Sequence, residues 1–507
     1  MDVFRDIRRG LGWLIAAISV FPLYAALRTD HRLLGEDPLI TLTFAKNLAR
    51  GDGFVFNHPP PVLGTTTPLF ALLVAAGDRL VPGAEATVIA VWLSAACWVA
   101  VLWIFVWFAG DLGLSSWQVL SIAGAVTVTG WVTRLDFEAY LFAALLVLAI
   151  ALHARGRPVA AGVVAALLFL TRGEGLLLFG VLAVATAVSD LRDRTPRLPG
   201  LVASRTARLA IGFGIPVLAW AAYALPTFGS VLPNTLAAKI AQGSSGLWQP
   251  FLGQLTAVWI PGWGRPLAPA AAPALSVAWV LVAAGLVVLV RRARPLLLLV
   301  AWTAAYVVGY GALGVAGYPW YACPVYLTLA VLLGVGLGSV AEWLAARVRP
   351  RALAIALAAA CLAAVLLPLG VPTARAAARP TPSPRHAAYY EMARWFREHA
   401  DPGASIAYHE VGYLGFYTDN RIVDLLGLVT PGLSEHVAAG DFAWGFWRER
   451  PNYLVYLEGS RFFEGILRDP RFVAGYRQVA TLDGYDGRPL TIFGRIAGRS
   501  TVRTTME

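Results

Sequence analysis

Long apolar segments recur along this chain, and no other feature constrains its fold as strongly. A membrane-spanning helix needs about 20 predominantly apolar residues, and a shorter run can include flanking residues to reach that length. Such runs lie at 11–27, 86–109, 117–133, 138–153, 159–171, 174–189, 209–226, 275–290, 295–314, 319–343 and 352–371. Hydrophobic residues make up 58% of the chain and charged residues only 14%, which excludes a soluble globular protein. We therefore predict a polytopic α-helical membrane protein with about 11 transmembrane helices.

Arginine clusters between the predicted spans indicate their orientation. The clusters begin at Arg5, Arg155, Arg192, Arg291 and Arg347. The positive-inside rule places each cluster on the cytoplasmic side, so an even number of crossings must separate any two of them. A further segment, 67–82, is interrupted by Asp78 and Arg79 and would break this parity if it crossed the membrane. We expect it to be a helix at the outer face of a multi-pass protein, with the N-terminus cytoplasmic and the C-terminus outside.

The basic residues do not indicate a nucleic-acid partner. The formal net charge is +11, but the arginines are dispersed in short clusters and do not form one patch. Lys46 and Lys239 are the lysines of the chain, and this preference for arginine, with abundant alanine, is typical of a GC-rich bacterial genome. We therefore expect a protein of the bacterial plasma (inner) membrane, with membrane lipids and no nucleic acid among its partners.

The apolar runs stop after residue 371, and the composition changes. The Pro-rich segment 372–384 predicts a linker between a transmembrane domain, residues 1–371, and a second domain, residues 385–500. In the second domain "HAAYYEMARWFREHAD" has helical periodicity, while "SIAYHEVGYLGFY", "NYLVYL" and "LTIFGRI" contain β-rich runs. We predict a small α/β domain, which the odd number of crossings places on the outer, extracytoplasmic face of the membrane.

Polar residues gather in the predicted outer loops, whereas the predicted inner loops hold mainly arginine. The first outer loop, about 28 to 85, contains the adjacent carboxylates Glu36 and Asp37 in "LLGEDPL". The other outer loops carry Arg134, Asp136, Glu138, Arg172, Glu174, Asn234, Lys239, Tyr318, Trp320 and Tyr321. Any chemistry is therefore expected to face outward.

Several of these stretches resemble motifs of the bacterial GT-C glycosyltransferases. The "ED" pair is followed by "ITLTFAKNLARGDGFVFN" and "GTTTPLFALLVAA". The stretch "RLDFEAYLF" stands where that family has a Gly-Leu-Glu-Thr-type motif. In the same way, "LTRGEGLLL" stands in the place of a Thr-Arg-Pro-Glu-Gly motif and "LPNTLAAK" in that of a Pro-Asn-Thr-x-x-Ala-Lys motif. The resemblance spans residues 11 to about 435, including the soluble-domain stretch "GYLGFYTDNRIVDLLGLVTP". The subgroup that it suggests is the actinobacterial cell-wall arabinofuranosyltransferases. Gly173, in place of proline, and Asp136-Phe137, in place of Gly-Leu, depart from the pattern.

The resemblance implies a GT-C-like fold, with juxtamembrane helices in the first outer loop, and a polyprenyl-phosphate-linked sugar as donor. The acceptor would be an extracytoplasmic glycan, a lipid-linked glycan or a protein. Asp37 takes the place of the catalytic base and Glu36 that of a supporting or metal-binding neighbour. Lys239, Arg172 and Asn234 are expected at the donor phosphate, and Glu138, Glu174, Tyr318, Trp320 and Tyr321 at the substrate. An Asp/Glu pair near a phosphate suits Mg²⁺, Mn²⁺ or Ca²⁺, although no cofactor is required by the sequence.

Each of these residues also has a purely structural interpretation. Asp37 before proline could cap a helix, Arg172 and Glu174 could form an ion pair that closes a hairpin, and Glu138 could pair with Arg134. Lys239 could be an ordinary solvated charge. The aromatic residues of "GYPWYACP" could belong to an interfacial belt.

His409 and Glu410 in "AYHEVG" are expected to be structural or to contact the acceptor, not to bind metal. Residues 244–263 could border the entry of a lipid donor.

Two other classes of function remain open at this point. A transporter or flippase of a lipid-linked glycan precursor would show internal repeats with broken spans in matching halves, and we find no such symmetry. A non-catalytic envelope scaffold would tolerate replacement of Asp37. A membrane glycosyltransferase is the leading hypothesis, with arabinofuranose as the first sugar to test.

Overall fold

The computed structural model describes residues 2–57, 61–81, 83–128, 135, 137–192, 204–260, 272–380 and 383–496. The chain forms two compact units. The first, here called the helical unit, comprises Met1–His31, Thr65–Pro233 and Gly246–Thr381. The second, here called the mixed unit, comprises Arg32–Gly64, Asn234–Ser245 and Pro382–Glu507.

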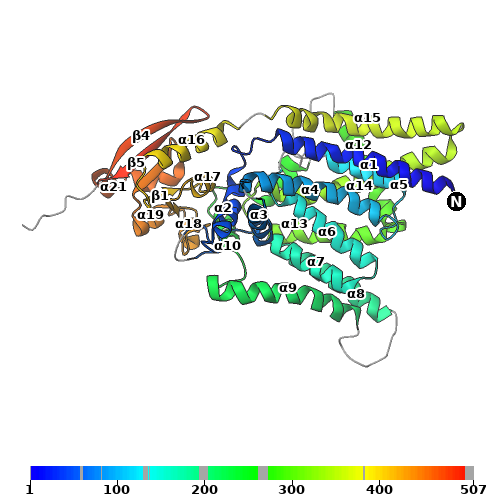
Figure 1. The fold of residues 1–507 in the computed structure, drawn as a ribbon, viewed down its shortest axis with the longest axis horizontal. Helices are drawn as coiled ribbons and strands as arrows, with labels where there is room; N and C mark the ends of the chain where they lie inside the picture. The colour runs from blue at the N-terminus through cyan, green and yellow to red at the C-terminus, as the bar shows by residue number, and fades with distance from the viewer. Residues whose placement is uncertain are drawn as a thin grey trace, which may run out of the picture. The chain divides into compact units, whose positions relative to one another are not determined.

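The helical unit is built of long apolar helices that pack along their lengths (Figure 1). Its α-helices are α1 (Asp2–Arg28), α3 (Pro68–Leu80), α4 (Ala86–Trp107), α5 (Ser116–Val128), α6 (Ala139–Ala154), α7 (Pro158–Thr171), α8 (Gly175–Arg192), α9 (Arg205–Phe228), α11 (Phe251–Gln254), α12 (Ala272–Arg291), α13 (Leu297–Ala312), α14 (Cys323–Arg347) and α15 (Arg351–Ala378). Short turns η3 (Leu255–Trp259), η5 (Arg294–Leu296) and η6 (Pro319–Ala322) complete it.

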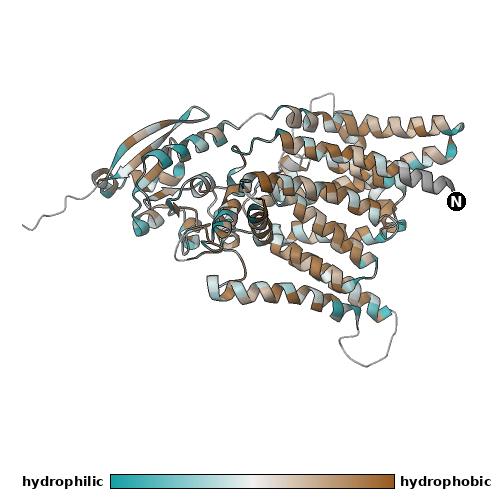
Figure 2. Ribbon diagram, viewed as in Figure 1, coloured by the Kyte–Doolittle hydropathy of each residue, from teal (hydrophilic) through white to brown (hydrophobic). Residues whose placement is uncertain are grey.

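The helices match the apolar runs of the sequence. Among the described residues, 8 helices are long and apolar enough to cross a membrane, and α5, α6 and α7 are shorter apolar helices. Together they coincide with the predicted segments, and Figure 2 shows them as predominantly hydrophobic. The segment 67–82, which we predicted not to cross, contains the shorter helix α3. Several predicted features, including Arg134, Asp136 and the end of the segment 244–263, lie outside the described residues.

Helix α14 is the most deeply buried of the candidate spans, and glycines let its neighbours approach closely. It packs against α5, α12 and α15. A Cβ at Gly336 would overlap the carbonyl oxygen of Leu281 on α12, and a Cβ at Gly285 would overlap that of Leu332 on α14. Small residues at such crossings are typical of helices that pack by van der Waals contact within a bilayer.

The mixed unit combines a sheet with short helices and two segments that come from earlier in the chain. These segments carry α2 (Glu36–Arg50) and α10 (Asn234–Ser244). The rest consists of α16 (Pro384–His399), β1 (Ser405–Tyr408), α17 (Gly412–Tyr417), β2 (Arg421–Asp424), α18 (Ser434–Ala438), α19 (Ala443–Glu449), β3 (Tyr453–Leu457), η7 (Arg461–Phe463), α20 (Glu464–Leu467), α21 (Pro470–Gly475), β4 (Tyr476–Tyr485) and β5 (Arg488–Arg495).

The sheet has 5 strands in the order β2-β1-β3-β5-β4. Strand β1 pairs in parallel with β2 and β3, and β5 pairs antiparallel with β3 and β4. Helix α16 packs on β4 and α17. The predicted small α/β domain is therefore confirmed.

Two details of the sequence prediction are wrong. Helix α15 continues through Ala378, so the first part of the expected linker 372–384 is helical, because its alanines outweigh the proline within it. The stretch "GYLGFY" was grouped with β-rich runs, but it forms helix α17. Tyr413 and Leu414 of this helix are buried, and the helix packs against α2.

Candidate functional site

The adjacent carboxylates Glu36 and Asp37 lie in the first turn of helix α2. Gly35 occupies the N-cap position in an extended conformation, and no side chain caps the helix. The interpretation of Asp37 as the capping residue is therefore wrong, because the helix begins one residue before it. Negative charge is stabilised at this end of a helix by the unpaired backbone N–H groups and the helix dipole. Glu36 is buried, whereas Asp37 remains half-buried.

Glu36 is held by the segment that follows strand β1. The backbone N–H of Gly412 donates to Oε1 of Glu36. A Cβ at Gly412 would overlap the carbonyl oxygen of Glu36, so only glycine fits this approach. Glu410, two residues before Gly412, forms an ion pair with Nη2 of Arg385 on α16.

The electrostatics of this cluster follow from its burial. Burial raises the pKa of Glu36 well above its usual value of 4.5, and the nearby charges of Glu410 and Asp37 raise it further. Burial also raises the pKa of Glu410, while Arg385 opposes that shift. Burial lowers the pKa of the adjacent His409 to about 3, so this imidazole is neutral at physiological pH.

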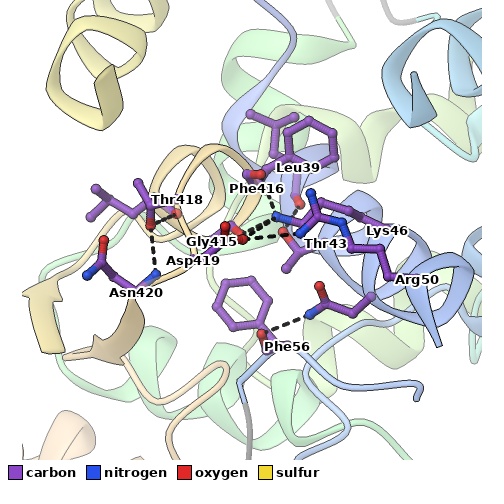
Figure 3. A network of polar contacts seen from close by, with 12 residues as sticks. Leu39, Thr43, Lys46, Arg50, Phe56, Gly415, Phe416, Thr418, Asp419 and Asn420 are labelled. Atoms are coloured by element: carbon purple, nitrogen blue, oxygen red, sulfur yellow. Dashed lines mark hydrogen bonds and ion pairs between the residues drawn. The ribbon is translucent and has the colours of Figure 1, made fainter. Parts of the chain in front are cut away.

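Helix α17 is fixed to α2 by a second set of polar contacts, shown in Figure 3. Nζ of Lys46 donates to the carbonyl oxygens of Gly415 and Phe416, at 3.3 and 2.6 Å. Arg50 Nη1 lies 3.2 Å from Oδ1 of Asp419. A lysine at the C-terminal end of a helix satisfies carbonyl groups that have no partner within the helix. Burial lowers the pKa of Lys46 to about 8.

Helix α10 brings the motif "PNTLAAK" into the mixed unit. Nδ2 of Asn234 donates to the carbonyl oxygen of Gly427 at 2.5 Å. The backbone N–H of Asn234 donates to the carbonyl oxygen of Leu63 at 2.9 Å. Oγ1 of Thr235 donates to the carbonyl oxygen of Gly64 at 2.7 Å. These bonds anchor the start of α10, and the role of Asn234 at a phosphate remains a prediction.

Lys239 lies farther along α10 and is buried, with 6% of its surface exposed. The interpretation as an ordinary solvated charge is therefore wrong. Its ammonium group interacts electrostatically with Glu410, described above, and with Asp424 of the loop after strand β2. A buried ammonium beside acidic groups is a compact positive charge that suits a phosphate.

Asp424, which the sequence analysis did not single out, organises the loop after strand β2. It is fully buried, and its carboxylate accepts the backbone N–H groups of Leu426 at 2.7 Å, Val429 at 3.0 Å and Leu428. Burial raises the pKa of Asp424 to about 6, although these N–H bonds oppose the shift. The loop that it holds carries the carbonyl groups that receive Asn234.

In the helical unit, Arg172 lies between two buried carboxylates. Its Nη1 is 2.7 Å from Oε1 of Glu138, and its Nη2 is 2.8 Å from Oε1 of Glu174. The hydroxyl of Tyr310 donates to the same Glu174 oxygen at 2.5 Å, and Nε1 of Trp302 donates to the Glu174 backbone carbonyl at 3.1 Å. The predicted ion pair of the "TRGEG" hairpin is present, and Glu138 joins it.

A small pocket lies beside this cluster. It is lined by Phe137, Glu138, Ala139, Phe142, Arg172, Trp320, Cys323 and Pro324. Trp320 stacks on Phe137 and on Tyr318, with ring centroids 5.8 and 4.6 Å apart, and the guanidinium of Arg172 is 5.6 Å from the ring centroid of Tyr321. The predicted aromatic residues therefore pack with one another, and Trp320 lines a cavity.

The role of Glu36 and Asp37 as metal ligands remains a prediction. Within the part of the chain that the structure describes, no group of 3 or more His, Cys, Asp or Glu side chains could hold a metal ion. Oε1 of Glu36 is engaged by the backbone N–H of Gly412. We derive no chemical step through a metal.

The comparisons with known proteins bear mainly on the fold. A family model described as "Domain of unknown function (DUF8728)" matches residues 378–502. No curated protein matches the chain. Among solved structures, ArnT from Cupriavidus metallidurans bound to undecaprenyl phosphate has a TM-score of 0.60 at 15% sequence identity, covering 96% of this chain and 98% of that chain. The apo state of the same ArnT has a TM-score of 0.57 at 15% identity, with the same coverage. The chain therefore shares the ArnT fold over nearly its whole length, and the predicted fold class is confirmed.

Proposed function

We propose that this protein is a membrane glycosyltransferase that moves a sugar from a polyprenyl phosphate to an extracytoplasmic acceptor. The observation that carries the proposal is the ArnT fold over 96% of the chain, because that ArnT binds undecaprenyl phosphate. The cluster of acidic residues and Lys239 in the mixed unit supplies groups suited to the reaction. The motif resemblance to arabinofuranosyltransferases makes arabinofuranose the first donor sugar to test.

Asp37 is the proposed general base. It is half-buried at a helix N-terminus, where a carboxylate is stabilised but still accessible. The acceptor hydroxyl transfers its proton to Asp37, and the acceptor oxygen bonds to the anomeric carbon of the sugar. The bond between that carbon and the phosphate oxygen breaks, and polyprenyl phosphate leaves with the bonding electrons. The transfer needs no reactant other than the donor and the acceptor.

Lys239 is the proposed ligand of the donor phosphate. We expect Lys239→Met to raise the donor KM by about 10- to 100-fold, because a hydrogen bond to a charged group contributes about 1.5–3 kcal/mol. Lys239→Arg keeps the positive charge and should raise the donor KM less than Lys239→Met does. The measurement is steady-state transfer at varied donor concentration. Equal donor KM values for wild type and Lys239→Met, in proteins with equal Tm, would remove Lys239 from this role.

The helical unit offers groups for the substrate. Glu138 and Trp320 line its cavity, and the aromatic faces of Trp320, Tyr318 and Tyr321 can pack against the apolar face of a sugar or against an isoprene unit. Arg172 and Glu174 are proposed to hold Glu138 in place, because Arg172 bridges the two carboxylates. Binding of a phosphate to Arg172 would require Glu138 or Glu174 to break its ion pair with Arg172.

The experiment compares transfer with flipping. Purified protein in proteoliposomes is given radiolabelled polyprenyl-phosphate sugars, arabinofuranose first, with lipid-linked and polysaccharide acceptors. The proposal predicts label in the acceptor. Movement of the intact donor across the bilayer without transfer would instead indicate a flippase, and the absence of both activities would indicate a scaffold. Antibody access to tags at each terminus tests the proposed orientation, with the N-terminus cytoplasmic and the C-terminal region outside the plasma membrane.

A further inference from the structure

Helix α17 follows strand β1 and is bonded to α2 at both of its own ends. At its start, the backbone N–H of Gly412 donates to Oε1 of Glu36, in the first turn of α2. At its end, the carbonyl oxygens of Gly415 and Phe416 accept from Nζ of Lys46, in the C-terminal half of α2 (Figure 3). The two helices are therefore joined at two well-separated points along α2.

Two tyrosines of α17 extend these contacts to the segment that leads into α2. The hydroxyl of Tyr413 donates to the carbonyl oxygen of Leu34 at 2.6 Å, and that of Tyr417 donates to the carbonyl oxygen of Arg32 at 3.1 Å. Tyr413 is fully buried. These bonds fix the chain immediately before Gly35, the N-cap residue of α2.

Two glycines of α17 let it approach its neighbours closely. A Cβ at Gly412 would overlap the carbonyl oxygen of Glu36. A Cβ at Gly415 would overlap the ring of Phe56, in the segment after α2. Helix α17 therefore has little room to shift while its end contacts hold.

Lys46 depends on α17 for its hydrogen bonds. Its side chain is 11% exposed, whereas Asp419, whose Oδ1 lies 4.0 Å from Nζ, has a side chain that is 85% exposed. An ion pair with so exposed a partner contributes little. The carbonyl oxygens of Gly415 and Phe416 are therefore the partners that compensate for the burial of the ammonium group.

These contacts bear on Asp37 through the rotation of α2. Successive side chains of an α-helix point about 100° apart, so the direction of the Asp37 carboxylate depends on how α2 is turned about its axis. A helix held at one point can still turn and tilt, whereas contacts at Glu36 and at Lys46 together restrain both movements. No side chain caps the N-terminus of α2, so its first turn relies on these contacts.

We propose that Lys46 is a positioning residue for Asp37: it holds the C-terminal carbonyl groups of α17, and α17 in turn holds the first turn of α2. Lys46 acts through α17 and does not touch the substrate. The role of Asp37 in this statement rests on the proposed function, whereas the coupling of the two ends of α2 through α17 does not.

The first test compares kcat with the donor KM. Lys46→Met keeps most of the length of the side chain but cannot donate to α17. Its kcat should fall about 10- to 100-fold, because misplacing a reacting group by about 1 Å has an effect of up to about 100-fold. Its donor KM, which depends on Lys239 in the proposed function, should stay at the wild-type value. Lys46→Arg keeps a charged donor and should recover part of the lost kcat.

Arg50→Met is the matched control for Lys46→Met. It removes a cation from the same helix, but one whose ion pair is with the exposed Asp419. Its kcat should equal that of wild type. A folded Lys46→Met protein with wild-type kcat would overturn the proposal.

A double-mutant cycle separates positioning from a general loss of structure. If Lys46 acts through Asp37, Lys46→Met should change kcat little in the Asp37→Asn protein, whose base is already absent. Two losses that multiply would show that Lys46 acts independently of Asp37 and would overturn the proposal. If Lys46→Met does not fold, Tyr413→Phe carries the same cycle, because it removes only the hydroxyl that donates to Leu34.

Hydrogen exchange followed by mass spectrometry tests the coupling without any activity. In Lys46→Met, the backbone amides of α17 and of the N-terminal half of α2 should exchange about 2- to 10-fold faster than in wild type, as expected for the loss of a hydrogen bond. Arg50→Met should match wild type. Unchanged exchange in the N-terminal half of α2 would overturn the proposal. If wild type transferred no sugar, the proposed function would fail, while this measurement would still decide whether α17 couples the two ends of α2.

Discussion

Asp37→Asn is expected to reduce sugar transfer by about 10²- to 10⁴-fold, the contribution typical of a general base. The amide is nearly the same size as the carboxylate but cannot accept the acceptor's proton. Since Asp37 is half-buried and does not cap α2, the fold should survive the change, and Tm should stay within a few degrees of wild type. The loss should appear in kcat and not in the donor KM, because the base acts in the transition state.

The matched control for this variant is Asp52→Asn, which changes an exposed carboxylate shortly after the same helix. It should transfer sugar at the wild-type rate. If Asp37→Asn were folded and retained wild-type turnover, Asp37 would not be the base. The acidic pair at the start of α2 would then serve only to hold the segment around Gly412, through its hydrogen bond to Glu36.

Arg172→Ala is expected to destabilise the helical unit strongly. It removes the guanidinium between Glu138 and Glu174 and leaves two buried carboxylates without a cation. Breaking a buried pair in this way costs about 3–5 kcal/mol. Thermal unfolding in detergent should show a large fall in Tm, and Arg172→Lys should recover part of it.

Arg155→Ala is the control for Arg172→Ala, because Arg155 forms an ion pair with Asp111 at the surface of the same unit. It should leave Tm unchanged. A folded Arg172→Ala protein with wild-type Tm and a raised donor KM would contradict the structural role. Such a result would support the prediction from the motif resemblance, in which Arg172 binds the donor phosphate.

The spans of the helical unit could be predicted because the bilayer sets their length and composition. Each apolar run had only to reach the thickness of the hydrocarbon core. The arginine parity predicts that the segment containing α3 does not cross the membrane. The short helix α17 could not be predicted in the same way. Its "GYLGFY" sequence has the composition of a strand, and its helical form depends on packing against α2, which lies far away in the sequence.

The site was predictable only in part, for a related reason. The resemblance indicated Asp37 and Lys239, and both are found in the mixed unit with Glu410. Glu410 was singled out together with His409, but its ion pair with Arg385 could not be predicted, because tertiary packing brings the two residues together. Glu138 was expected to pair with Arg134, one helical turn away, but its partner among the described residues is Arg172 from another hairpin. Local spacing predicts local pairs, whereas these contacts join distant segments.

The most direct test of the central claim is the appearance of free polyprenyl phosphate. Proteoliposomes containing wild type or Asp37→Asn are given a polyprenyl-phosphate sugar and an acceptor, and the lipid products are followed by mass spectrometry. The proposed transferase predicts that free polyprenyl phosphate accumulates in step with glycosylated acceptor in wild type and not in Asp37→Asn. A donor that crosses the bilayer with its sugar–phosphate bond intact, in both proteins alike, would contradict the account.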